Sequence, residues 1–105
     1  MIELAPDLGS ARIELSGSLT IYEVSEARGA LLATLSGAPG AAWSLGLARI
    51  DELDTAGVQL LLAAQRYLAA SGGSLQVRDC SSTVLELLAL LRLPRLCPDL
   101  PTAQP

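Results

Sequence analysis

The sequence contains no histidine and no lysine, and each absence removes a class of chemistry. Without histidine, the chain can assemble neither a Ser/His/Asp relay nor an imidazole metal site. Without lysine, it has no P-loop lysine and no amine for Schiff-base chemistry. Because these absences exclude most enzyme classes, we expect a protein that is not an enzyme and that needs no metal or cofactor.

Aromatic residues and cysteines are also scarce, with one tryptophan, two tyrosines, no phenylalanine and two cysteines. Half of the residues are hydrophobic, so the core must be built from leucine, valine, isoleucine and alanine. Cys80 and Cys97 match no metal or redox spacing, and we interpret both as ordinary half-buried thiols. A chain of 105 residues is long enough for one domain with a core and too short for two.

Long apolar runs and basic surfaces are missing as well. No apolar run approaches the ~20 residues of a membrane span. The N-terminus lacks the basic region and apolar stretch of a secretory signal. We therefore expect a soluble, cytoplasmic protein with no direct membrane insertion. The net charge is −4, and no basic stripe carries interleaved aromatic residues, which excludes nucleic acid as the expected partner.

Apolar residues recur with strand and helix periods in turn. Alternation and apolar runs predict strands over residues 2–4, 11–16, 43–48 and 74–78, the second ending at Gly17. Capping-box spacing predicts helices that begin at Thr20 and Thr83, and a third helical pattern runs over residues 55–70. An acidic link, residues 49–53, precedes that helix. The last helix should end near Arg92, before Pro94.

This order predicts an α/β fold, a single-domain sandwich with a four- to five-stranded, mostly parallel sheet. Trp43 to Ala48 is apolar on both sides and should be the central strand. The small size leaves room for helices mainly on one face of the sheet. We expect the domain to span residues 1–96 and residues 97–105 to form an irregular, proline-rich tail.

The last helix carries more apolar residues than one core face needs. Four would suffice for that face, and three more are apolar: Val84, Leu87, Leu88 and Leu91, then Leu85, Leu90 and Leu93. Two interpretations stay open. The proline-rich tail folds back over the surplus residues, or they form a protein contact, as in a homodimer seam or a docking face for an ATPase or kinase.

The most informative stretch joins the strand at 43–48 to the helix at 55–70. Asp54 is a strong helix N-cap, because its carboxylate can accept hydrogen bonds from backbone N–H groups of the first turn. Thr55 then places a hydroxyl at the positive end of the helix. Gly57 keeps the first turn free of bulk, so that another group can come close to Thr55. The hydroxyl could be a nucleophile, part of an anion site or a phosphate acceptor; the simpler alternative is a neutral first-turn residue.

Asp54-Thr55-Ala56-Gly57, placed between an apolar strand and an apolar helix, resembles the Asp-Ser/Thr-x-Gly signature of STAS domains. That family includes the bacterial anti-sigma-factor antagonists. The passage Gly17 to Tyr22 from strand to helix matches as well, as does Gly72-Gly73 before a strand that ends near Asp79. The resemblance covers most of the chain and implies a STAS-like fold. It also implies that a partner kinase phosphorylates Thr55.

The resemblance implies a non-enzymatic, anti-sigma-factor-antagonist-like regulatory module that binds an anti-sigma kinase or a related signalling ATPase. Serine is usual in place of Thr55, and serine or threonine in place of Ala56. The chain is therefore also similar to a divergent branch, which gives the alternative of a cytoplasmic STAS subunit regulating the ATPase of a phospholipid-trafficking ABC transporter. We expect the partner to bind at Asp54, Thr55, Ala56, Gly57, Val58 and Tyr22.

Two further residues have open roles at this edge of the predicted sheet. Strand ends and helix starts meet at one edge of a parallel α/β sheet, so Tyr22 and Asp79 could both lie near Thr55. Tyr22 either packs against the domain or flanks the site. Asp79 either shapes a turn or joins the site.

Overall fold

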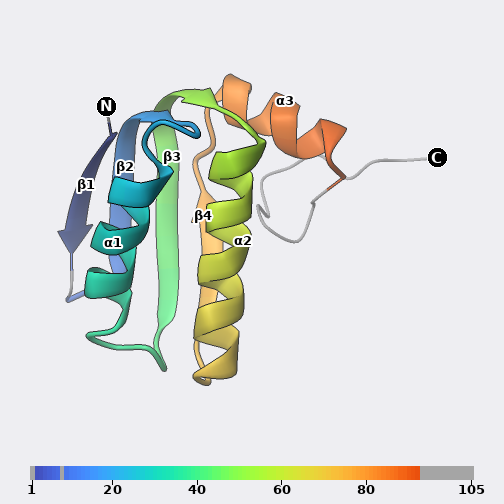
Figure 1. Ribbon diagram of the computed structural model, residues 1–105. Helices are drawn as coiled ribbons and strands as arrows, with labels where there is room; N and C mark the ends of the chain where they lie inside the picture. The colour runs from blue at the N-terminus through green and yellow to red at the C-terminus, as the bar shows by residue number, and fades with distance from the viewer. Residues whose placement is uncertain (1, 8, 93–105) are drawn as a thin grey trace.

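Four strands form one sheet in the computed structural model, which describes residues 2–7 and 9–92 (Figure 1). The strands lie side by side in chain order: β1 (Ile2–Asp7), β2 (Arg12–Leu19), β3 (Ala42–Leu53) and β4 (Ser74–Arg78). β1 is antiparallel to β2, whereas β2, β3 and β4 are parallel. A helix follows each parallel strand: α1 (Val24–Leu35), α2 (Thr55–Ala70) and α3 (Ser82–Leu90). The predicted α/β class and mostly parallel sheet are confirmed.

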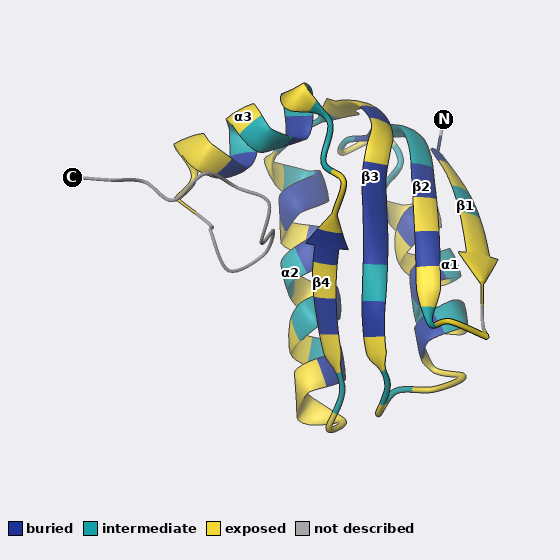
Figure 2. Ribbon diagram, turned by 180° about the vertical axis from the view of Figure 1, so that it is seen from behind, coloured by how far each residue is buried: buried dark blue, intermediate teal, exposed yellow. Residues whose placement is uncertain are grey.

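The helices cover mainly one face of the sheet, as expected. α1 and α2 lie over the same face, whereas α3 lies at the end of the sheet where β3 and β4 finish (Figure 1). Within residues 2–7 and 9–92, the opposite face, seen in Figure 2, carries no helix. β3 is central, but the prediction that it is apolar on both sides is wrong. Trp43, Leu45 and Leu47 point toward the helices and are buried. Ser44 and Gly46 lie on the opposite face of the strand.

The strand ends differ from the prediction because pairing between strands extends them. β2 continues through Gly17, which adopts a φ of 100° beside a shift in register, to Leu19. β3 continues through the predicted acidic link, because Ser18 pairs with Glu52 and Leu19 with Leu53. Irregularities of this kind let a strand continue while they change its direction. β1 is longer than residues 2–4 for the same reason, since it pairs along its whole length with β2.

Two helix starts also differ from the capping-box prediction. The Thr20–Glu23 spacing does bring the two side chains together, yet it closes a turn, and α1 begins only at Val24. α3 is capped by Ser81 and not by Thr83: the Ser81 hydroxyl accepts from the Val84 N–H at 3.4 Å. That hydroxyl also donates to the Ile50 carbonyl of β3 at 2.8 Å, which ties the start of α3 to the sheet.

The core between the sheet and the helices is almost wholly aliphatic, as predicted, with the indole of Trp43 as its aromatic member. Cys80 is half-buried, as expected. In α3, Val84 and Leu88 are buried, whereas Leu90 is 79% exposed; Leu91, just after the helix, is 38% exposed. Leu91 was expected in the core face, but it is the residue after the helix ends.

Several predictions lie outside the described residues: those for Leu93 and Cys97, the domain boundary at residue 96, and the tail at 97–105. Within residues 2–7 and 9–92, no helix is long and apolar enough to cross a lipid bilayer.

Candidate protein-interaction site

Asp54 connects two segments that are distant in the sequence. One carboxylate oxygen, Oδ1, accepts from the Gly57 N–H at 3.0 Å, which is the predicted N-cap of α2. The other, Oδ2, accepts from the Ile21 N–H at 2.9 Å, in the turn between β2 and α1. A single side chain therefore holds the start of α2 beside the turn that precedes α1.

Gly57 provides the second connection between these segments. A Cβ atom at this position would lie 2.2 Å from the Leu19 carbonyl oxygen and 2.8 Å from Cδ1 of Leu53. The first turn of α2 can therefore approach the end of β2 only because residue 57 has no side chain. The sequence predicted that Gly57 lets another group come close to Thr55; the close approach in the structure is instead that of the Leu19 carbonyl to Gly57 itself.

The predicted site residues at the start of α2 differ in how exposed they are. Thr55 is exposed and Ala56 half-buried at the start of α2, with Thr55 as the first helical residue. Gly57 is buried, and Val58 is only 1% exposed, within the core. Val58 therefore offers no surface to a partner in this structure, and Gly57 acts through the close approach it permits. Thr55 is the exposed residue of the Asp54–Gly57 motif.

The tip formed by Ile21 and Tyr22 is a strongly exposed apolar surface. Ile21 is 61% and Tyr22 91% exposed. The interpretation of Tyr22 as a packing residue is therefore wrong. Sequence reasoning missed Ile21, although a large apolar residue between Thr20 and Glu23, outside the apolar stripe of the helix, is a usable signal. Because Asp54 binds the Ile21 N–H, this tip is held beside the start of α2.

Two acidic residues lie near the end of β3, shortly before Asp54. Asp51 and Glu52, at the end of β3, are exposed, and the Ser18 hydroxyl lies 3.2 Å from Glu52 Oε1 and 3.5 Å from Asp51 Oδ1. Among the described residues, no group of three acidic or cysteine side chains is arranged to hold a metal ion. The end of β3, which precedes Asp54 in the sequence, is therefore acidic and exposed.

The backbone conformation of Asp79 is one that aspartate often adopts in turns. Its φ of 53° is in the left-handed region, where aspartate is tolerated better than most residues, and it lies in the turn between β4 and α3. The structure thus supports the interpretation that Asp79 shapes a turn.

Glu23 gives the site a testable dependence on pH. The Thr20 hydroxyl donates to Glu23 Oε1 at 2.7 Å and the Thr20 N–H donates at 3.0 Å, and both bonds hold the pKa of Glu23 below its usual value. Because the pKa of Glu23 is lower in the folded state, its ionised carboxylate contributes to the free energy of unfolding. This contribution is fully present above the unfolded-state pKa, about 4.3, and is lost as the pH falls through the folded-state pKa. The melting temperature of wild type should therefore fall more steeply below about pH 4.3 than that of Glu23→Gln. Parallel curves from differential scanning calorimetry would contradict this assignment.

Asp54 variants should separate the two bonds of its carboxylate. Asp54→Ser keeps an oxygen for the Gly57 N–H but is too short for the Ile21 N–H, whereas Asp54→Ala loses both. We expect Asp54→Ala to cost about 1–2 kcal/mol in urea unfolding and Asp54→Ser clearly less. Hydrogen exchange at the Ile21 amide should accelerate in both variants. Unchanged exchange in Asp54→Ser would show that this bond does not hold the tip.

Known proteins share this fold. The chain is similar to the structure of the anti-sigma factor antagonist SpoIIAA in its unphosphorylated form, with a TM-score of 0.74 and 20% identity over 92% of this chain and 85% of that one. It is equally similar in fold to a Thermotoga maritima protein described as a candidate anti-sigma factor antagonist, with a TM-score of 0.74 and 15% identity over 91% and 82% of the two chains. At these identities, the similarity shows the fold.

Among curated proteins, none matches the chain significantly. The model of the family described as "Mlab, STAS domain" matches residues 2–98, which is nearly the whole sequence. The match includes the four strands and three helices of the described residues, together with the Asp54–Gly57 motif. This chain therefore belongs to the STAS domain family.

Proposed function

We propose that this protein is a non-enzymatic, cytoplasmic regulatory module that docks onto a partner protein and is switched by phosphorylation of Thr55. The observation that carries the proposal is the juxtaposition at one edge of the sheet. Thr55 is exposed at the start of α2, and Asp54 holds the exposed Ile21–Tyr22 tip beside it. A partner can bury the apolar surface of the tip when it binds. A phosphate on the Thr55 hydroxyl would oppose that burial.

The switch follows from electrostatics. A phosphate on Thr55 adds a charge of about −1.5 to −2, which the free N–H groups and the dipole of α2 tolerate in water. Docking of the Ile21–Tyr22 tip would place that phosphate against the partner and remove its water. Burying an uncompensated charge costs several kcal/mol, and Asp51 and Glu52 add repulsion. Phosphorylation would therefore prevent docking while the fold stays intact.

The partner should carry an apolar pocket and basic residues, complementary to the apolar tip and to Asp51 and Glu52 at the end of β3. An anti-sigma kinase or a related signalling ATPase would supply both the docking surface and the phosphate donor. The similarity in fold to proteins named as anti-sigma factor antagonists supports this class.

A second candidate partner is the ATPase of an ABC transporter, with Thr55 as a contact residue that is not phosphorylated. The observation that favours it is the pair Thr55–Ala56, in place of the serine-rich motif of the antagonists. The same edge of the sheet would serve both partners.

The experiment that tests the proposal is capture of the partner by the immobilised chain, followed by incubation of the complex with ATP. We expect a kinase-type ATPase to be recovered and mass spectrometry to place phosphate on Thr55. Thr55→Val removes the hydroxyl, keeps the shape and should stay unmodified. Recovery of an ABC ATPase with Thr55 unmodified would support the second candidate, and phosphate on any other residue would overturn the switch.

A further inference from the structure

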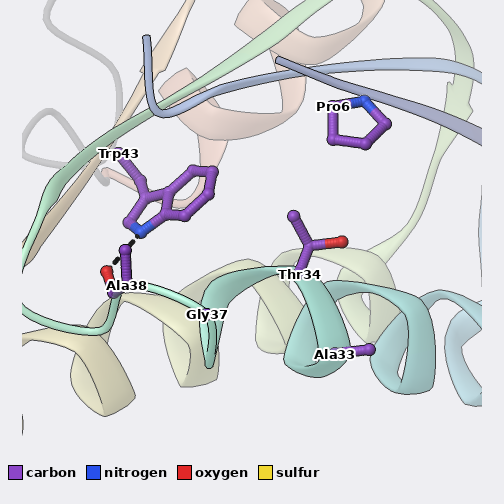
Figure 3. Close-up of a pocket in the computed structure, with 6 residues that line it drawn as sticks. All are labelled: Pro6, Ala33, Thr34, Gly37, Ala38 and Trp43. Atoms are coloured by element: carbon purple, nitrogen blue, oxygen red, sulfur yellow. Dashed lines mark hydrogen bonds between the residues drawn. The ribbon is translucent and has the colours of Figure 1, made fainter. Parts of the chain in front are cut away.

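A cavity of about 410 Å³ lies between β1 and the C-terminal end of α1. Its walls come from β1, the end of α1, the following loop and the start of β3, as Figure 3 shows. The lining residues are Pro6, Ala33, Thr34, Gly37, Ala38 and Trp43. Small-ligand sites have volumes on the order of 300–1,000 Å³ and mostly apolar walls, and this cavity has both properties.

The burial of β1 shows independently that the sheet and the helix layer separate here. Its inward-facing residues are Ile2, Leu4 and Pro6, and along the strand they change from buried to half-buried to exposed. On the other wall, Ala33 carries only a methyl group and Gly37 has no side chain, so neither residue fills the space. The cavity therefore results from small residues at one end of α1 that face the far end of an edge strand.

The polar groups of the walls restrict the ligand. The indole Nε1–H of Trp43 already donates to the Ala38 carbonyl at 2.9 Å (Figure 3), and the Thr34 hydroxyl donates to the Ala30 carbonyl at 3.0 Å. Both side-chain donors of the lining are therefore occupied within the protein. In addition, the last turn of α1 carries no basic residue, so the negative end of its dipole is not compensated. An anion would find neither a free side-chain donor nor a positive charge here.

We infer that this cavity binds a small ligand with an aromatic or similarly flat apolar group and a neutral or cationic substituent. The apolar group packs against the ring of Pro6, beside the largely buried indole of Trp43, and a cation is favoured by the end of α1. β3 separates this cavity from Thr55 by on the order of 30 Å. The ligand site is therefore independent of the proposed docking edge, and failure of either proposal leaves the other untouched.

Trp43 is the single tryptophan of the chain and reports directly on the cavity. The test is a fluorescence titration with benzylamine, benzyl alcohol and benzoate, which share one ring and differ in charge. Benzylamine and benzyl alcohol should change the Trp43 emission saturably, and benzoate should bind at least about fivefold more weakly than benzylamine. Amide shifts in NMR spectra should change at Ala33, Thr34 and Gly37 and stay constant at Thr55.

Ala33→Leu fills the cavity from an exposed helix position and should abolish the response to benzylamine. Ala70→Leu adds the same side chain at an exposed position of α2 and should leave it unchanged. Absence of a saturable response in wild type, or a response that survives in Ala33→Leu, would overturn the site. Equal binding of benzoate would overturn the charge preference. The NMR shifts in the wild-type chain decide the question should Ala33→Leu fail to fold.

Discussion

Replacing Gly57 by alanine should lower the free energy of unfolding by at least about 2 kcal/mol, although this change normally stabilises a helix. The new Cβ would lie 2.2 Å from the Leu19 carbonyl oxygen, which belongs to a strand backbone and cannot rotate away. Either the first turn of α2 or the end of β2 must move. In thermal unfolding, the melting temperature should fall by at least about 8 °C. Because Gly57 sets the approach of α2, the Asp54 to Ile21 bond should weaken as well.

Gly29 provides a matched control within the same chain. It is a helical glycine in α1, and nothing lies within 4 Å of the Cβ it would gain. Gly29→Ala should therefore stabilise the protein by about 0.5–1 kcal/mol, the ordinary effect of helix propensity. Opposite signs at the two glycines would show that the close approach decides the effect. A stabilised Gly57→Ala variant would contradict the packing described for this edge.

Thr55→Glu should weaken binding of the captured partner by at least about a hundredfold, while the melting temperature changes by less than about 4 °C. The carboxylate imitates part of the phosphate charge at an exposed position, where the start of a helix tolerates a negative group. The cost appears only when docking of the Ile21–Tyr22 tip removes water from that charge. Isothermal titration calorimetry and thermal unfolding measure the two quantities separately.

Gln76→Glu is the matched control for charge. Gln76 is exposed on β4, between the buried Leu75 and Val77, and it pairs with Ser44 near the start of β3, so the same added charge lies far from the docking edge. This variant and Thr55→Ala should both bind as wild type does. If Thr55→Glu also binds like wild type, the hydroxyl does not control docking, and the proposed switch is wrong.

Local signals were sufficient for some elements. α2 spans the predicted residues 55–70, because Asp54 caps it and Ser71-Gly72-Gly73 stops it, and both signals act within a few residues. β4 has the predicted bounds for a similar reason, since its apolar residues alternate cleanly between two turns. Where a helix or strand is delimited by its own neighbours in sequence, the pattern is enough.

Other elements depended on distant partners. The segment from Arg49 to Leu53 reads as an acidic link, yet it is strand, because β2 continues far enough to pair with it. Ser81 caps α3 ahead of Thr83 because its hydroxyl also reaches the Ile50 carbonyl of β3. Neither outcome follows from the residues next to these positions.

The sequence by itself determined the α/β order, the Asp54 cap, the motif around Thr55 and, through it, the family. Only the tertiary structure showed that Asp54 also holds Ile21, that Leu19 approaches Gly57, and that Val58 is buried while Tyr22 is exposed. Caps and periodicity are local and are encoded within one or two turns of chain. Which residues share an edge depends on strand register and on backbone contacts across more than thirty residues, and local propensity does not encode these.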